Sequence, residues 1–314
     1  MSPIVLSAII LLVLLFLNVP VFAAITGACV AYTLANPSSG ITAILAMQRE
    51  ISGMQSVAML AIPFFVATGA LMNYCGITDR MLRFCKVLTG HMYGGLGQVN
   101  IALSTLMGGM SGSSLADAAM EAKLLVPDMR KSGYPNGFAS AITAASSMIT
   151  PLIPPGIAAI IYGSVTGASI GRLFVAGIVP AIILCASMMV VVSLYSRRHG
   201  IPRLREKRAS GKELWDAFKP AVLPLCLPII IIGGIRFGIF TPTEAGAIAI
   251  FYALLLGIIY REIRLDNILT CIKETVSTTA SIMLIVGAAT CFSWILTWEN
   301  VPQNMTTFLI SLCH

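Results

Sequence analysis

The sequence predicts an all-α polytopic membrane protein, because its composition is too apolar and too poor in charge for a soluble fold. Apolar residues, counted with Tyr, make up 57% of the 314 residues, and charged residues make up only 11%. A soluble domain carries roughly a quarter charged residues. Several apolar runs approach the roughly 20 residues that a helix needs to cross a bilayer. A lipid bilayer is therefore the first expected partner, and helices are expected because they satisfy their own backbone hydrogen bonds.

The apolar runs define the expected membrane-depth segments, and three more polar stretches lie between them. The stretches 41–53, 78–90 and 262–275 mix charged and apolar residues at helical spacing, which is typical of interfacial helices. The first membrane segment is expected to be interrupted near Asn18 and Pro20. The membrane-depth segments are expected at 4–34, 56–76, 94–110, 136–167, 172–195, 217–235, 242–260 and 276–298.

The basic residues predict the orientation of the chain in the membrane. Seven of the 20 Lys and Arg lie in the loop 196–216, which places that loop in the cytoplasm. If 94–131 is a re-entrant hairpin that returns to its own side, only Arg49, Arg172 and Arg236 lie outside. The N-terminus is then expected in the cytoplasm. The net charge of +7 therefore reflects topology, and no nucleic-acid partner is expected.

A weak internal repeat runs through the chain with an offset of about 220 to 225 residues, and it predicts an inverted-repeat transporter. NVPVFAAI (18–25) aligns with FTPTEAGA (240–247), and SVAML (56–60) aligns with SIML (281–284). The charge count places the interfacial helices 41–53 and 262–275 on opposite sides, so an odd number of crossings separates the copies. The alternative is that any two apolar stretches resemble each other.

Two segments place polar groups or irregular backbone at membrane depth. GGMSGSSLADAA (108–119) predicts a re-entrant chain reversal with free amides and hydroxyls. In TAASSMITPLIPPG (143–156), three prolines remove backbone donors, which predicts a discontinuous helix with released carbonyls near 147–153. Helix ends whose carbonyls face a cavity bind cations. The alternative for each segment is a kink whose polar groups are satisfied by neighbouring helices.

An enzyme and a channel are the competing functions. Residues 109–112 spell GxSG, which resembles the nucleophile motif of rhomboid-type intramembrane serine proteases. That chemistry needs a histidine beside the serine, and His91, His199 and His314 all lie outside the membrane-depth segments. Lys123 is predicted about three helical turns past the reversal, too far to act as the base. A channel would favour a continuous polar stripe, and the sequence shows none. We therefore expect neither a channel nor an enzyme, and we expect no catalytic residues.

Three motifs in order resemble the DctM-like large membrane subunit of tripartite ATP-independent periplasmic (TRAP) transporters. They are GGMSGSSLADAA (108–119), GYPNGFASAITAASSMITPLIPPGIAAIIYG (133–163) and GIFTPTEAGAIAIFYALLLGIIYREI (238–263). The resemblance implies an elevator-type, sodium-coupled importer of small organic acids, such as C4-dicarboxylates or sialic acid, in a bacterial or archaeal inner membrane. It also implies a small four-helix membrane subunit, a periplasmic substrate-binding protein, and no cofactor besides Na⁺ as coupling ion.

The resemblance also implies a sodium site in this half of the fold. Its ligands would be the hydroxyls of Ser111 and Ser114 and the carbonyls of Thr150, Ile153 and Pro155. Many members have Gly at position 150 and Ser at position 156, so the backbone geometry here departs from the family pattern. The substrate-contact residues stay unassigned. The remaining hairpin and helix-break residues are Gly112, Ser113, Asp117, Ser146, Ser147, Pro151, Pro154 and Gly156, and the second-repeat motif is Thr241, Pro242, Thr243 and Glu244.

Glu244 is expected either to cap its helix or to take part in coupling. The family's second hairpin and second broken helix are expected near residues ~330 and ~375 by the repeat offset. The sequence is therefore expected to represent a truncated or split subunit with an incomplete second repeat. The expected divisions are 1–93 (scaffold and arm helix), 94–171 (transport hairpin and broken helix), 172–216 (membrane helix and basic loop) and 217–314 (start of the second repeat).

Overall fold

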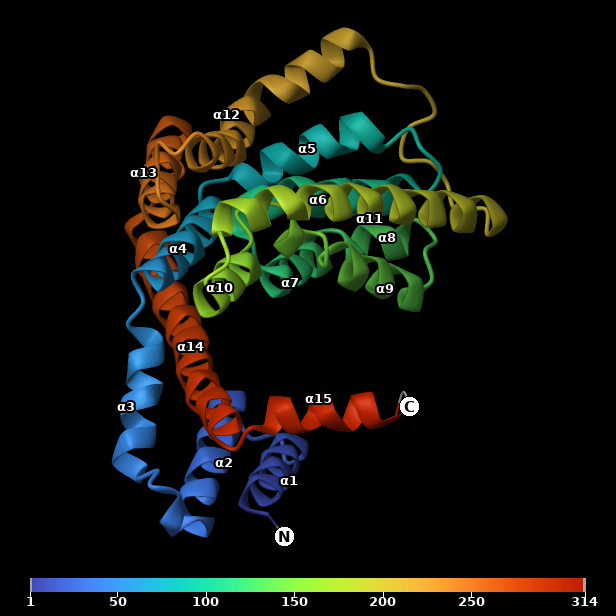
Figure 1. Cartoon of the computed structure of the whole chain (residues 1–314). Coiled ribbons are helices and arrows are strands. Elements are labelled where there is room, and N and C mark those ends of the chain that lie inside the picture. Colours follow the sequence, from blue (N-terminus) through green and yellow to red (C-terminus); the bar gives the residue numbers. More distant parts are fainter. Residues whose placement is uncertain (1, 313–314) are drawn as a thin grey trace. The chain divides into compact units, whose positions relative to one another are not determined.

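The computed structural model describes residues 2–312, and their regular structure is entirely helical (Figure 1). The chain forms two compact units. One contains the residues up to Val57 together with those from Ser277 onward, and the other is Ala58–Val276. The all-helical expectation is confirmed for the described residues. The four functional divisions expected from the sequence stay a prediction.

The first unit begins with two short helices, α1 (Pro3–Phe16) and α2 (Val21–Ala35). The break falls where expected, because Asn18 has a φ of +61° and Pro20 precedes α2. The two helices pack side by side, and the Ser7 hydroxyl donates to the Ala28 carbonyl at 2.7 Å. The expected single interrupted crossing is therefore wrong. The prediction of a cytoplasmic N-terminus counted one crossing here, so it has lost that support.

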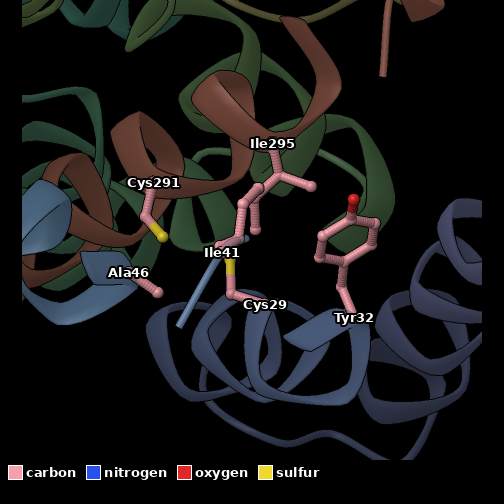
Figure 2. Packing of buried hydrophobic residues seen from close by; sticks show 6 residues of the cluster. All are labelled: Cys29, Tyr32, Ile41, Ala46, Cys291 and Ile295. Carbon is pink, nitrogen blue, oxygen red and sulfur yellow. The ribbon is translucent and has the colours of Figure 1, made fainter. Parts of the chain in front are cut away.

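The core of the first unit joins α2, α3 (Ala43–Met54) and the C-terminal half of α14 (Leu265–Trp298) (Figure 2). Arg49 of α3 lies over the Trp294 ring at 5.0 Å. A 3₁₀ turn, η1 (Pro37–Ser39), links α2 to α3, and α15 (Val301–Leu312) follows α14. The six buried residues of the core are Cys29, Tyr32, Ile41, Ala46, Cys291 and Ile295.

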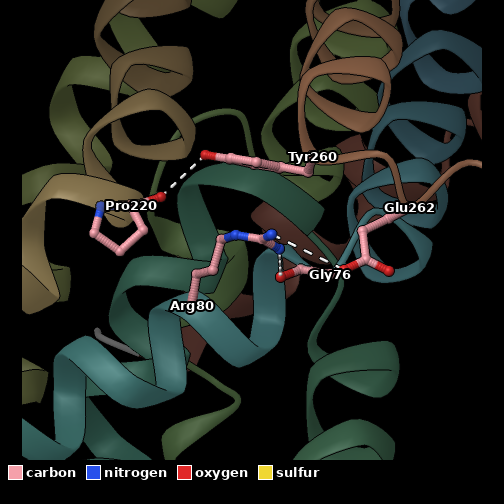
Figure 3. Close-up of polar contacts among 5 residues, drawn as sticks. All are labelled: Gly76, Arg80, Pro220, Tyr260 and Glu262. Carbon is pink, nitrogen blue, oxygen red and sulfur yellow. Dashed lines mark hydrogen bonds and ion pairs between the residues drawn. The ribbon is translucent and has the colours of Figure 1, made fainter.

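The second unit packs α4 (Ala61–Tyr74) against α13 (Pro242–Tyr260), and α5 (Ile77–Thr89) against α12 (Gly211–Arg236). The 3₁₀ turn η2 (Val57–Leu60) precedes α4. Where these helices meet, Arg80 Nη1 donates to the Gly76 carbonyl at 2.6 Å, and Arg80 Nη2 lies 3.9 Å from the Glu262 carboxylate (Figure 3). Its guanidinium also covers the Tyr260 ring at 3.8 Å, which anchors the start of α5 to the end of α13.

The rest of the second unit is the candidate site and the long helix that follows it. In order these are α6 (Gly95–Ser111), α7 (Ser114–Leu124), α8 (Val126–Lys131), α9 (Asn136–Ser146), η3 (Thr150–Leu152), α10 (Ile157–Thr166) and α11 (Ile170–Arg198). Within Figure 1, α6 and α11 run beside each other above α7, α8 and α9.

Five helices of the described chain are long and apolar enough to cross a bilayer. The residues 136–166 form a sixth candidate that is bent by 47° at the break after Leu152. The separate interfacial helix expected at 262–275 is wrong, since α14 runs without interruption from Leu265 to Trp298. The sequence has no proline or glycine around the expected boundary between residues 275 and 276, so nothing in the backbone ends the helix there.

Candidate functional site

The chain reverses between α6 and α7 within two residues. Gly112 has a φ of +60°, the left-handed conformation that ends α6, and its amide donates to the Gly108 carbonyl. Ser113 then caps α7 by accepting a hydrogen bond from the Ala116 amide at 3.4 Å. The two helices run antiparallel, because the Ser104 hydroxyl reaches Glu121 at 2.9 Å. The predicted chain reversal is therefore present, built from one glycine and one capping serine.

The predicted discontinuous helix is present between α9 and α10. α9 ends at Ser146, a short 3₁₀ turn follows, and α10 starts at Ile157. Some of the expected free carbonyls are recaptured by this turn. The Thr150 amide donates to the Ser147 carbonyl at 3.2 Å, and the Leu152 amide donates to the Ile149 carbonyl at 3.0 Å. Release of backbone acceptors is thus limited to the part of the break that follows Ile149.

The hairpin tip and the helix break lie against each other through glycines. A Cβ added to Gly108 would stand 3.0 Å from Thr150 Cα, 3.1 Å from its carbonyl oxygen and 3.2 Å from Ile153 Cβ. A Cβ added to Gly112 would stand against the Pro155 carbonyl oxygen, inside van der Waals contact. Only residues without side chains permit this approach, so the sequence brings backbone oxygens of the break to the tip.

The predicted sodium ligands gather in this place to different degrees. Ser111 is 7% exposed, and its hydroxyl has no hydrogen-bond partner within the described residues. Ser114 is half-buried at the first residue of α7. The Thr150 side chain is buried and donates to Asp117 Oδ2 at 2.8 Å. The carbonyls of Thr150 and Pro155 reach the tip as described above. The assignment of these groups to sodium stays a prediction.

The other motif residues surround this contact. Ser146 and Ser147 are buried at the end of α9, and Pro154 and Gly156 are buried in the break, whereas Pro151 is half-buried. Gly156 packs against the Pro151 carbonyl, where a Cβ would overlap the oxygen. These residues shape the break and position its backbone.

Sequence reasoning missed a buried polar network next to the site. Glu121 has no exposed surface, and it lies one helical turn after Asp117. Asn100 Nδ2 donates to the Thr143 hydroxyl at 3.2 Å, and the Ser146 hydroxyl lies 2.7 Å from Asn100 Oδ1. The available signal was the spacing of Asp117 and Glu121, two carboxylates four residues apart on a helix whose other residues, apart from Lys123, are apolar or small.

The second-repeat motif forms a helix cap. The Thr241 hydroxyl accepts from the Glu244 amide at 3.3 Å, and the Glu244 carboxylate accepts from the Thr241 amide at 2.8 Å. This reciprocal pair is a capping box at the start of α13, with Pro242 at its first residue. Of the two expected roles of Glu244, the structural cap is confirmed. Thr243 lies in the same first turn.

The geometry of a serine protease is absent from the described residues. The Ser111 hydroxyl has no partner there, although a protease serine requires a base within reach. His199 is exposed and stacks on Tyr195. Lys123 is exposed on α7, and His314 lies outside the described residues.

The family comparison agrees with the site. The family model described as tripartite ATP-independent periplasmic transporter, DctM component, matches residues 8–314. The chain belongs to the DctM family. TRAP large permease proteins are transporter subunits rather than enzymes, so transport is the class of function that the family establishes.

Curated relatives share substantial identity with this DctM-family chain. It is 42% identical over 95% of its length to the sialic acid TRAP transporter large permease protein SiaM of Vibrio cholerae. It is 40% identical over 83% of its length to the 2,3-diketo-L-gulonate TRAP transporter large permease protein YiaN of Escherichia coli. It is 35% identical over 81% of its length to the C4-dicarboxylate TRAP transporter large permease protein DctM of Pseudomonas aeruginosa. The chain spans 69%, 61% and 59% of these relatives, respectively.

Proposed function

We propose that this chain is part of the large permease subunit of a sodium-coupled TRAP importer of small organic acids. A periplasmic binding protein delivers the acid, and a small four-helix membrane subunit completes the complex. The observation that carries the proposal is the contact between the hairpin tip and the helix break, where the buried Ser111 hydroxyl has no partner in the described part of the chain. A buried polar group without a partner costs free energy unless a ligand satisfies it.

The chemistry of this contact suits sodium. Na⁺ is a hard cation, and hard cations prefer oxygen ligands. The tip offers hydroxyl oxygens at Ser111 and Ser114, and the break offers carbonyl oxygens at Thr150, Ile153 and Pro155. The C-terminal end of α6 also points its last carbonyls at the tip, and the negative end of a helix dipole attracts a cation.

The opposite helix ends suit an organic acid. α7 and α10 both begin next to this contact, and helix N-termini favour anionic groups. The substrates named for the relatives include sialic acid, 2,3-diketo-L-gulonate and C4-dicarboxylates, which share a carboxylate. We therefore propose a carboxylate as the common chemical feature of the cargo.

The proposal includes a location and a movement. The chain would lie in a bacterial or archaeal inner membrane, with the basic residues around Arg203 and Arg205 facing the cytoplasm. The segment 94–171 would move as the transport domain of an elevator against a scaffold, as one half of an inverted repeat. The basic loop and the compact hairpin with its broken helix support this arrangement.

The experiment compares serine variants of the complete transporter in proteoliposomes. Ser111→Ala and Ser114→Ala each remove one oxygen ligand without adding bulk. A lost contact of about 1 to 1.5 kcal/mol raises the sodium needed for half-maximal uptake roughly tenfold. Thr150→Gly keeps the carbonyl and should shift the sodium curve less. Ser140→Ala on the exposed face of α9 is the matched control and should leave the curve unchanged. Unchanged sodium curves for both Ser111→Ala and Ser114→Ala would refute the site.

A further inference from the structure

Glu121 occupies a buried polar cluster that the proposed sodium site does not use. Its side chain has no exposed surface, and the Ser104 hydroxyl donates to Oε1 at 2.9 Å. Its other oxygen, Oε2, lies 3.3 Å from the Ser146 hydroxyl. Asp117 lies one turn earlier on α7 and is 2% exposed, and its Oδ1 has no partner among the described residues. Two carboxyl groups therefore share one buried region.

Among the residues that the structure describes, no positive charge balances these carboxyl groups. The helices and turn that pack on α7, apart from α8, are α6, α9 and η3, and their sequences contain no charged residue. Lys123 on α7 and the basic residues Arg130 and Lys131 of α8 are exposed, and Asp128 of α8 adds only another carboxylate. A further titratable group close to Glu121 is the buried Cys85 thiol of α5. Burying two carboxylates without a neighbouring cation is strongly unfavourable, so the cluster favours a neutral carboxylic acid.

The pattern of donors and acceptors in the cluster indicates which oxygen carries the proton. The Ser146 hydroxyl has one hydrogen, and its nearest acceptor is Asn100 Oδ1 at 2.7 Å. Asn100 Nδ2 donates to Thr143, and the Thr143 hydroxyl donates to the Ala139 carbonyl at 3.0 Å. With its hydrogen given to Asn100, Ser146 meets Glu121 Oε2 as an acceptor. A hydrogen bond between these two oxygens then takes its hydrogen from Glu121, because the remaining acceptor of the Ser146 hydroxyl, the Thr143 carbonyl at 3.1 Å, lies farther away than Asn100 Oδ1.

We propose that Glu121 is a proton-binding site that joins the hairpin to the broken helix. The carboxylic acid accepts from Ser104 of α6 through Oε1 and donates through Oε2 to Ser146 of α9. It thereby links the hairpin to the broken helix, and these two segments together form the proposed sodium site. When pH rises, the Oε2–H bond breaks and the proton passes to water. The remaining carboxylate then faces the Ser146 oxygen and the neighbouring Asp117, so the link between α7 and α9 weakens.

The first test is the pH dependence of stability, measured on the purified chain in detergent. Glu121→Gln keeps an acceptor for Ser104 and a donor for Ser146 but cannot lose its proton. The matched control is Glu206→Gln, because Glu206 is an exposed glutamate of the basic loop. A proton bound only in the folded state stabilises the protein at low pH, and this stabilisation is lost as pH rises. The wild-type and Glu206→Gln melting temperatures should therefore fall more steeply than that of Glu121→Gln as pH rises above about 4.3, the pKa of a glutamate in the unfolded chain.

The second test observes the proton directly and needs no folded variant. Infrared spectra of the wild-type chain at neutral pH should show the C=O band of a buried protonated carboxyl group, and Glu121→Gln should remove it. Absence of the band in the wild type overturns the proposal. A Glu121→Gln chain that fails to fold, or that loses stability with pH as the wild type does, also overturns it. Because neither test involves transport, their outcome is distinguishable from failure of the sodium site.

Discussion

Gly112 is the residue at which the hairpin turns and also touches the helix break. Its φ of +60° is a left-handed conformation, which costs a residue with a side chain about 1 to 2 kcal/mol. It also faces the Pro155 carbonyl, where no space is left for a Cβ. Two independent constraints therefore act on this one position.

Gly112→Ala should lower the free energy of unfolding more than a Gly→Ala substitution at a position where only the left-handed backbone conformation is unfavourable. Gly133→Ala provides that comparison, because Gly133 has a φ of +88° and nothing within 4 Å of its would-be Cβ. We expect Gly133→Ala to cost about 1 kcal/mol and Gly112→Ala at least about 1 kcal/mol more, measured by thermal unfolding in detergent. Equal losses for the two variants would show that the tip does not press against the break.

At the scale of elements, α12 shows how a membrane helix tolerates internal proline. The helix contains Pro220, Pro224 and Pro228. Pro224 has no amide hydrogen, so the Pro220 carbonyl loses the helical partner that residue 224 would provide. The Tyr260 hydroxyl of α13 donates to that carbonyl at 3.0 Å (Figure 3). A side chain from the neighbouring helix thus restores the missing bond.

Tyr260→Phe should therefore destabilise the contact between α12 and α13. The ring keeps its place under the Arg80 guanidinium, so the variant removes only the hydrogen bond to the Pro220 carbonyl. The expected cost is about 1 kcal/mol in the free energy of unfolding. Tyr162→Phe is the control, since Tyr162 is 58% exposed on α10. A loss for Tyr260→Phe no greater than for the control would mean that the freed carbonyl needs no partner.

The sequence predicts elements best where it contains explicit breakers. Gly112 with Ser113 marks the hairpin, and the prolines from 151 to 155 mark the broken helix, and both are found where expected. The sequence pattern predicted the wrong elements where packing between distant segments determines the structure. The Ser7 to Ala28 contact that pairs α1 with α2 has no local signal, and α14 continues through a change in polarity that suggested a boundary. Glu121 was missed because only packing shows that its partners lie on α6 and α9.

At the scale of the whole molecule, the central claim is that sodium drives import through a complete TRAP transporter of which this chain is a part. Family membership establishes a transporter permease, and the oxygen-rich contact between tip and break supports sodium as the coupling ion. If coupling is correct, the sodium gradient supplies the free energy for accumulating the organic acid. The binding protein supplies the acid, so neither the sodium gradient alone nor the binding protein alone should be sufficient for accumulation.

The most direct measurement is uptake of labelled organic acid by the full-length permease and its small subunit, reconstituted in proteoliposomes with the matching binding protein. The acids named for the relatives serve as the substrate panel. We predict accumulation of one of these acids when an inward sodium gradient is imposed, and none when potassium replaces sodium or the binding protein is omitted. Equal accumulation with potassium in place of sodium would contradict the account.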